Sequence, residues 1–480
     1  MASRATLSSI VPPERWGLQR NNLSLFSRHF NARGRPARHV ALLAGRLAAG
    51  FGCRPGRLAC LLPALGLGVA ACGQPAGCVR VVSWADYREL ALEQEIADSF
   101  AIRHPDIRLC VESLGGSGIY REKVLTSIAA GTPPGVFLLD GIDIPAFVNE
   151  VVLLDLMPYA RRVGIDTAAF HPRLLELFMR DGRLIAFPKG FTPMVVYYNR
   201  NVFDAARVSY PSAGWTWDSF RRTAARLTRE TDGDGAVDTW GFGWPREFFY
   251  LQSWLWAGGG ELLSPAGDRA TGYLDTGATL RALDFYLGLA TRDSVVPRIE
   301  MFRRESSVPV LRLFASNRLG MFVSGHWSMP QLLEHERAGR IRFGVAPLPT
   351  IDGSAATPVL YAAGWAVPRA STQRRRAVQV AAFLASATAQ RIRARGGLEI
   401  PALTQVAADV ARRDTTNRES VFVATAAAGR HSWGARVAPW REVEDVLLDL
   451  LDRPLVRRES IESVARELAR SIDRILDGAR

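Results

Sequence analysis

The sequence lacks the local signatures of the common exported hydrolases. It contains no Gly-x-Ser-x-Gly nucleophile elbow and no His-Glu-x-x-His zinc motif. Its seven histidines show no spacing that is typical of metal ligands. Because no motif supplies a nucleophile, a general base or a metal set, we expect a protein that is not an enzyme and that needs no cofactor.

Acidic residues are almost missing from the first 60 positions, and this locates the basic excess of the chain. The formal net charge is +13, and residues 1–60 hold ten arginines against one acid, Glu14. The remaining residues hold 50 basic and 46 acidic side chains. Since the excess belongs to the N-terminal segment, the composition does not predict nucleic-acid binding.

The apolar run near the N-terminus is too short to span a membrane. Leu58–Ala70 has 13 residues, whereas a spanning helix needs about 20. Arg54 and Arg57 precede the run, and Val69-Ala70-Ala71-Cys72 follows the pattern of a bacterial lipobox. This order predicts a leader over residues 1–71 and acylation of Cys72, which would tether an exported protein to the outer face of the cell membrane. The alternative is a buried Leu/Ala-rich helix with a free cysteine.

Residues 1–51 are not required by the signal-peptide interpretation. They represent either an over-extended gene model or a real N-terminal extension, and the sequence leaves both open.

Cysteines are few, and three of the five lie at or before the proposed anchor. The other two, Cys78 and Cys110, could pair outside the cytoplasm. We place them on neighbouring parallel strands at positions that are offset along the strands, and this disfavours a disulfide.

From residue 79 onward, buried strands alternate with helices. Short apolar runs at 79–84, 106–113 and 135–140 are separated by segments with helical periodicity. Runs that are apolar on both faces predict a parallel sheet covered by helices, with ligands beyond the carboxyl ends of the strands. Those ends carry Trp84, the glycine-rich turn 115–118, and Asp140 to Asp143.

The Gly-Gly-Ser-Gly turn at 115–118 permits two interpretations. Its backbone could cradle a phosphate, but it lacks the Gly-Lys-Ser/Thr ending of a P-loop and the spacing of a dinucleotide fingerprint. A plain tight turn is the simpler interpretation, and Ser117 is retained as a candidate ligand contact.

Longer segments, taken in order, resemble a known family. They are "VRVVSWADYRELALEQEIADSFAIRHPDIRL", "YREKVLTSIAAGTPPGVFLLD", "GRLIAFPKGFTPMVVYYNRNVFDAA", "WTWDSFRRTAARLTRETDGDGAVDTWGF", "LGMFVSGHWSM", "RFGVAPLP" and "YAAGWAVPRAS". This set is similar to the extracellular solute-binding proteins (family 1) of bacterial ABC importers, in the carbohydrate-binding branch that includes the maltodextrin-binding proteins. The resemblance covers nearly everything from Val79 to the end.

The resemblance implies an α/β fold of two hinged lobes with a ligand cleft between them. We expect the first lobe to comprise 79–187 and about 365–410, and the second 190–360 and about 415–480. A strand, a Pro-Lys-Gly interruption and a further strand in 182–203 suit a crossing between lobes. The implied partners are a carbohydrate-like solute and the permease subunits of an importer, and the protein is expected to be a monomer.

Candidate ligand contacts follow from the resemblance and from the chemistry of sugars, which offer an apolar face and a rim of hydroxyls. Trp327 and Trp365 match family positions that stack on sugars, although His326 stands where the family usually has Pro. The further candidates are Asp140, Asp143, Trp84, Phe191, Trp254, Trp256 and Ser117. For each tryptophan the alternative is packing in the core.

An acidic loop at 230–238 partly matches a calcium-binding loop. Glu230, Asp232, Asp234 and Asp238 occupy positions 1, 3, 5 and 9, but Gly241 replaces the glutamate at position 12. We therefore predict no metal site here. An exported carbohydrate-active hydrolase and a ligand-binding sensor module remain as alternatives to an importer component, and the sequence does not identify the solute.

Overall fold

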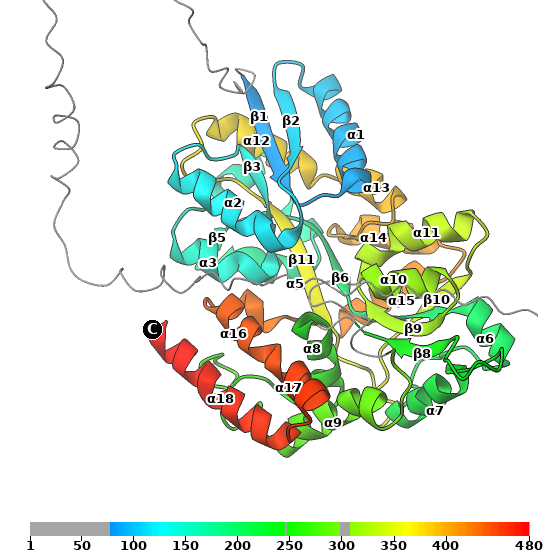
Figure 1. Ribbon diagram of the computed structural model, residues 1–480. Coiled ribbons are helices and arrows are strands. Elements are labelled where there is room, and N and C mark those ends of the chain that lie inside the picture. The colour runs from blue at the N-terminus through cyan, green and yellow to red at the C-terminus, as the bar shows by residue number, and fades with distance from the viewer. Residues whose placement is uncertain (1–76, 245–246, 298–307, 480) are drawn as a thin grey trace, which may run out of the picture. The chain divides into compact units, whose positions relative to one another are not determined.

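Two β-sheets of different size form the framework of the protein (Figure 1). The computed structural model describes residues 77–244, 247–297 and 308–479, which belong to one compact unit, 73–480. The predicted leader and the predicted anchor Cys72 lie outside the described residues.

The larger sheet contains the three strands predicted from the apolar runs. β1 (Cys78–Ser83) pairs in parallel with β2 (Arg108–Ser113) on one side and with β3 (Val136–Asp140) on the other. β1 and most of β3 are buried, as continuous apolar runs require. The parallel α/β arrangement predicted for this part of the chain is confirmed.

Two long antiparallel strands complete the larger sheet. β11 (Val359–Ala366) lies between β3 and β6 (Phe187–Pro193), so the order is β12-β6-β11-β3-β1-β2. The short strands β12 (Ile400–Pro401) and β13 (Arg430–His431) pair with β6 and β11. A separate hairpin joins β4 (Met179–Arg180) to β5 (Arg183–Leu184).

The smaller sheet has the order β10-β7-β9-β8. Its strands are β7 (Val195–Asn199), β8 (Trp240–Gly243), β9 (Leu319–Ser324) and β10 (Phe343–Ala346). β6 belongs to the larger sheet and β7 to the smaller one, with only Met194 between them. The chain returns between β10 and β11, so both predicted crossings connect the two sheets. The exact lobe boundaries stay predictions.

Helices cover both sheets. The helices up to β7 are α1 (Tyr87–Arg103), α2 (Ser117–Ala129), α3 (Ile144–Asn149), α4 (Met157–Ala160) and α5 (Pro172–Phe178). The helices between β7 and β11 are α6 (Arg200–Ala206), α7 (Trp217–Leu227), α8 (Phe248–Ala257), α9 (Gly277–Thr291), α10 (Val308–Ala315) and α11 (Met329–Arg337). The remaining helices are α12 (Arg374–Leu384), α13 (Ala387–Arg395), α14 (Thr404–Arg413), α15 (Arg418–Ala427), α16 (Trp440–Leu447), α17 (Asp449–Arg457) and α18 (Ile461–Gly478).

Side-chain caps start several of these helices where the sequence places them. The Asp86 carboxylate accepts from the first turn of α1, and Thr216 with Ser219 forms a capping box on α7. The buried face of α7 holds Phe220 and Leu227.

A buried ion pair joins segments that are 300 residues apart in the sequence. The Arg393 guanidinium on α13 donates to both oxygens of Glu93 on α1, at 2.6 and 2.8 Å. Their side chains are 0% and 3% exposed. The pair therefore fastens a late helix onto the N-terminal βα units.

The two cysteines of the folded part form a disulfide, which our sequence interpretation disfavoured. Cys78 pairs with Arg108 and Cys110 with Arg80, so the cysteines are offset by two residues. An offset of two leaves both side chains on the same face of the sheet. The Cα atoms are 5.9 Å apart, within reach of a disulfide, and the Cys78–Cys110 bond is present. The predicted offset was right and the conclusion drawn from it was wrong.

None of the helices in the described part of the chain combines the length and the apolar character that crossing a membrane requires.

Candidate ligand-binding site

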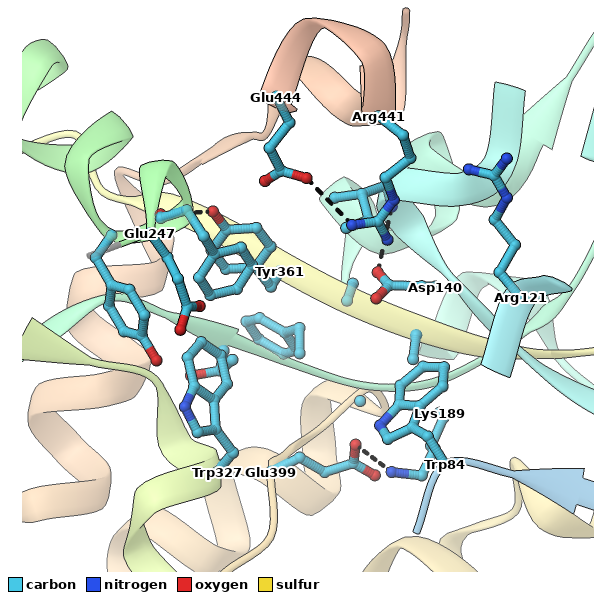
Figure 2. A pocket seen from close by; sticks show the side chains of 18 of the residues that line it. Trp84, Arg121, Asp140, Lys189, Glu247, Trp327, Tyr361, Glu399, Arg441 and Glu444 are labelled. Carbon is cyan, nitrogen blue, oxygen red and sulfur yellow. Dashed lines mark hydrogen bonds and ion pairs between the residues drawn. The ribbon is translucent and has the colours of Figure 1, made fainter. Parts of the chain in front are cut away.

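A cavity of about 720 Å³ lies where the two crossing strands meet the helices around them (Figure 2). Its aromatic lining consists of Trp84, Phe191, Phe248, Phe249, Tyr250, Trp327 and Tyr361. Its charged lining consists of Glu89, Glu122, Asp140, Glu247, Glu399, Glu444, Asp445, Arg121, Lys189 and Arg441. A volume of this size suits a small-molecule ligand, and the mixture of aromatic and polar side chains is typical of such sites.

Widely separated parts of the sequence supply this lining. Trp84 follows β1 and Asp140 ends β3, so the carboxyl ends of parallel strands face the cavity as the sequence predicts. Lys189 lies on β6 and Tyr361 on β11, while Trp327 lies in the 3-10 turn His326–Ser328 after β9. Helices α1, α2, α8 and α16 and the segment just before β12 contribute further lining.

Three aromatic rings form one wall. The rings of Phe249 and Tyr361 stack at 3.7 Å between centroids, and the Tyr361 hydroxyl donates to the Phe249 carbonyl at 2.9 Å. The Trp327 ring lies 5.5 Å from Phe249 and 6.1 Å from Tyr361. Gly325 makes room for this indole, because a Cβ at that position would collide with the ring. The wall is therefore fixed in orientation before a ligand arrives.

An ion pair lies on the floor of the cavity. The Lys189 ammonium donates to Glu399 Oε2 at 2.7 Å, and both side chains are largely buried (Figure 2). Gly190 permits this approach, because a Cβ there would collide with the Glu399 carboxylate. The other oxygen, Glu399 Oε1, is buried and has no hydrogen-bond partner among the described residues.

A second charged network holds α16 against the end of β3. Arg441 donates to Asp143 at 3.1 Å and to Glu444 at 3.1 Å. Arg121 contributes a longer ion pair of 3.8 Å to Asp143. Burial, together with the charge of Asp143, raises the pKa of Asp140 to about 7. Two neighbouring acids therefore compete for the basic side chains at this end of the cavity.

The carboxyl group of Glu89 also has a perturbed pKa. Burial raises the pKa of Glu89 to about 7, and the nearby Lys189 charge opposes this shift. The described residues offer the Glu89 side chain neither a hydrogen bond nor an ion pair.

His326 takes the place of the usual proline and anchors the turn that carries Trp327. Its backbone N–H donates to the Thr192 hydroxyl at 2.7 Å. Its Nδ1 lies 2.9 Å from the Gly397 carbonyl, and its Nε2 lies 3.0 Å from the Glu419 carboxylate. A carbonyl and a carboxylate both accept hydrogen bonds, so this arrangement favours the doubly protonated ring. Burial lowers its pKa, but Glu419 outweighs burial and raises the pKa above the ordinary value.

The structure brings some of the predicted contacts into the cavity. Trp327, Trp84, Asp140 and Phe191 line it. Asp143 lies just behind the lining and is 6% exposed. Ser117 begins α2, and its side chain lies outside the described part of the structure.

Trp365 is a core residue, so the expectation that its ring faces the cleft does not fit this structure. It lies on β11 opposite Leu138 and Phe187, is 0% exposed, and is absent from the cavity lining. The Arg393 guanidinium lies over its ring at 5.2 Å. The core-packing alternative accounts for this tryptophan.

Trp254 and Trp256 also lie away from the cavity. Trp254 is 0% exposed and packs against Phe220 and other rings of the second hydrophobic cluster. The Trp256 indole donates to Glu261 at 3.2 Å, and the Arg430 guanidinium covers its ring. Residues on α8 that line the cavity come earlier in the helix, at Phe248 to Tyr250.

Sequence reasoning missed much of the charged lining. Lys189 had a signal, since it interrupts a predicted strand and is one of only two lysines in the chain. Arg441 and Glu444 had none, because α16 reaches the cavity only through the tertiary fold.

The acidic loop brings three of its four predicted members together. Glu230, Asp232 and Asp238 each place an oxygen within 4.8 Å of the others. The Asp238 carboxylate already accepts from the backbone and hydroxyl of Thr231. These are ordinary turn contacts.

Comparison with known proteins supports the interpretation of this cavity as a ligand-binding site. Residues 85–391 match the family described as "Bacterial extracellular solute-binding protein". A protein of Brucella abortus (strain 2308), named only as a binding protein, is 24% identical over 265 residues, which are 53% of this chain and 59% of that protein. The diacetylchitobiose binding protein DasA of Streptomyces coelicolor is 23% identical over 208 residues, 43% of this chain and 45% of DasA. The chain thus spans about half the length of these curated relatives.

Solved structures share the fold. The ABC substrate-binding protein from Listeria monocytogenes in complex with cycloalternan has a TM-score of 0.73 at 20% identity, covering 83% of this chain and 98% of that chain. Maltose-bound MalE3 of T. maritima has a TM-score of 0.71 at 21% identity, covering 84% and 100%. UgpB from Mycobacterium tuberculosis in complex with glycerophosphocholine has a TM-score of 0.72 at 20% identity, covering 84% and 99%. The two-lobe binding-protein fold that the sequence predicted is confirmed.

Proposed function

The chain belongs to the family of bacterial extracellular solute-binding proteins, and we propose that it binds a carbohydrate in the cavity of Figure 2 and delivers it to an ABC importer. The observation that carries this proposal is the pairing of one aromatic wall with a rim of carboxylates in one cavity. Rings remove the apolar face of a sugar from water, while carboxylates accept from its hydroxyls.

The related proteins support a carbohydrate as the solute. Their names record cycloalternan, maltose and diacetylchitobiose as ligands, and one records glycerophosphocholine. The aromatic wall of Trp327, Phe249 and Tyr361 supplies the surface on which a sugar ring would stack.

Binding would act through the two crossing segments. β6 and β11 line the cavity and continue into connections with the smaller sheet, so a rotation there would close the cavity around a ligand. Arg88 on α1 and Glu334 on α11 form a bidentate ion pair at 2.5 and 2.9 Å. This pair joins a helix of the larger sheet to a helix of the smaller one, and would favour the closed arrangement.

The remaining parts of the proposal concern location and partners. Acylation of Cys72 would hold the protein at the outer face of the membrane, where it meets permease subunits as a monomer. Membrane-fraction protein from bacteria that express the full chain should start at Cys72 and carry acyl chains by intact mass, and Cys72→Ala should abolish both features. Retention of the variant on the membrane would refute the anchor.

Calorimetric titration against a panel of sugars, polyols and glycerophosphodiesters tests the function. A carbohydrate should bind, raise the melting temperature by mass action, and be recovered unaltered by mass spectrometry. Hydrolysis of a bound glycoside at enzyme-like rates, or exclusive binding of a ligand that is neither a sugar nor a free polyol, such as glycerophosphocholine, would refute the proposal.

A further inference from the structure

The cavity has an excess of acidic side chains. Among the described residues that line it, seven carboxylates face three basic side chains, Arg121, Lys189 and Arg441. The chain after the first 60 residues, with the cavity included, is nearly balanced in charge, since it holds 50 basic and 46 acidic side chains. The negative character is therefore a local property of the site.

The three basic side chains are already engaged. Lys189 lies 2.7 Å from Glu399, and Arg441 lies 3.1 Å from both Asp143 and Glu444. Arg121 lies 3.8 Å from Asp143. An anionic ligand would have to displace these carboxylates, and it would meet the surplus carboxylates as like charges.

Two acidic acceptors, in contrast, are incompletely satisfied. Glu399 Oε1 is buried without a hydrogen-bond partner among the described residues. The Glu89 carboxylate has neither a hydrogen bond nor an ion pair in that part of the chain. Both groups lie near Lys189, whose single charge is shared between them. A buried acceptor without a donor is costly, and a cationic donor offers the largest relief.

Resting on the function proposed above, we propose that the solute is an amino sugar, and that its protonated amine is received by the carboxylates of Glu89 and Glu399. The aromatic wall of Trp327, Phe249 and Tyr361 receives the apolar ring face, and the ammonium donates to the oxygens that lack donors. Cation and ring are thus recognised at different walls of the same cavity. Burial raises the pKa of Glu89 to about 7, and a bound cation would lower it again because it stabilises the ionised carboxylate.

The proposal separates three ligand classes that the fold alone leaves open. Glycerophosphate-type anions are disfavoured by the charge balance. Neutral sugars can stack on the aromatic wall, but they do not compensate the surplus negative charge of the carboxylates. Amino sugars match both features.

The test is a calorimetric titration of the mature protein with disaccharides that differ only at C2. Chitobiose carries amines, diacetylchitobiose carries acetamides, and cellobiose carries hydroxyls. We expect chitobiose to bind at least about tenfold tighter than either neutral analogue at low ionic strength, since charge-assisted hydrogen bonds exceed neutral ones by about that factor. Added salt should reduce the preference.

A substitution assigns the preference to the cavity. Glu89→Gln should bring the ratio of amine to hydroxyl affinity close to one. Asp98→Asn is the matched control, because Asp98 is an exposed carboxylate on the same helix and outside the cavity. It removes the same charge and should keep the ratio.

Each other outcome overturns the inference in a distinguishable way. If cellobiose, diacetylchitobiose or maltose binds as tightly as chitobiose or tighter, the amine proposal fails and the carbohydrate function stands. If the folded protein binds none of these sugars but binds glycerophosphocholine, both proposals fail. If Glu89→Gln keeps the full preference, the assigned carboxylate is wrong and the proposal fails as stated.

Discussion

Truncation of two tryptophans, Trp327→Ala and Trp365→Ala, separates ligand contact from core packing on one molecule. The family resemblance gave both residues the same role, and the structure gives them different ones. Trp327 lines the cavity beside Phe249 and Tyr361, while Trp365 is 0% exposed on β11. Trp327→Ala should therefore weaken ligand binding, and Trp365→Ala should lower the stability of the fold.

The magnitudes follow from what each ring contacts. Removing the Trp327 indole deletes apolar area that would cover a sugar face, at a cost of about 1.5–3 kcal/mol of binding free energy. That equals about a tenfold to over a hundredfold rise in Kd. Removing the Trp365 indole leaves a cavity beneath Arg393, which should lower the free energy of unfolding by about 3–5 kcal/mol.

The assay measures both quantities on both variants. Urea denaturation of the unliganded protein gives the free energy of unfolding, and calorimetry at a temperature where each variant is folded gives Kd. Trp327→Ala should change mainly Kd, and Trp365→Ala mainly unfolding. The reasoning is refuted if Trp327→Ala keeps full affinity while losing several kcal/mol of stability, or if Trp365→Ala loses affinity while keeping its stability.

Three further predictions concern stability. Glu93→Ala leaves the Arg393 charge buried without its partner. It should lower the free energy of unfolding, measured by urea denaturation, by about 3–5 kcal/mol. An unchanged midpoint of the urea transition would contradict the reasoning that this ion pair is buried. Reducing the disulfide, or Cys110→Ser, should cost about 3–4 kcal/mol for cysteines 32 residues apart, which denaturation with and without reductant measures. His326 has a folded pKa above its unfolded value, so the stability it gains from Glu419 is complete below the unfolded pKa and is lost as pH rises through the folded pKa. A His326→Gln variant should lack this fall between about pH 6.5 and alkaline pH, and parallel profiles would refute the imidazolium.

Local pattern was sufficient for the first βα units. The apolar runs that became β1, β2 and β3 and the Thr216 cap of α7 depend on neighbours within a few positions, so periodicity and capping chemistry identify them. The position of β11 between β3 and β6 depends on pairings about 170 to 230 residues away in sequence, which no local pattern encodes. The resemblance, rather than periodicity, supplied that part of the fold.

The family resemblance predicted Trp327 in the site, and sheet topology predicted two further residues. Trp84 and Asp140 follow from the rule that ligands lie beyond the carboxyl ends of parallel strands. Arg441 reaches the cavity because α16 docks on the end of β3 through Asp143, a contact between residues 298 positions apart. The disulfide was missed for a geometric reason, since an offset of two along neighbouring strands still leaves two cysteines within reach.

The misassignment of Trp365 follows from the course of β11. Tyr361 pairs with Thr192 at the cavity, and Trp365, four residues later, pairs with Phe187 in the sheet interior. Ala363 still lines the cavity, so the strand leaves the cavity wall over the last two residues before Trp365, about 7 Å at about 3.3 Å per residue. The distance of a tryptophan from the crossing therefore decides whether it contacts the ligand or packs in the core. A sequence motif does not record this distance. The same geometry means that a ligand stacked on Tyr361 contacts the strand on which the cavity would hinge, so binding energy at the aromatic wall acts directly on the crossing segment.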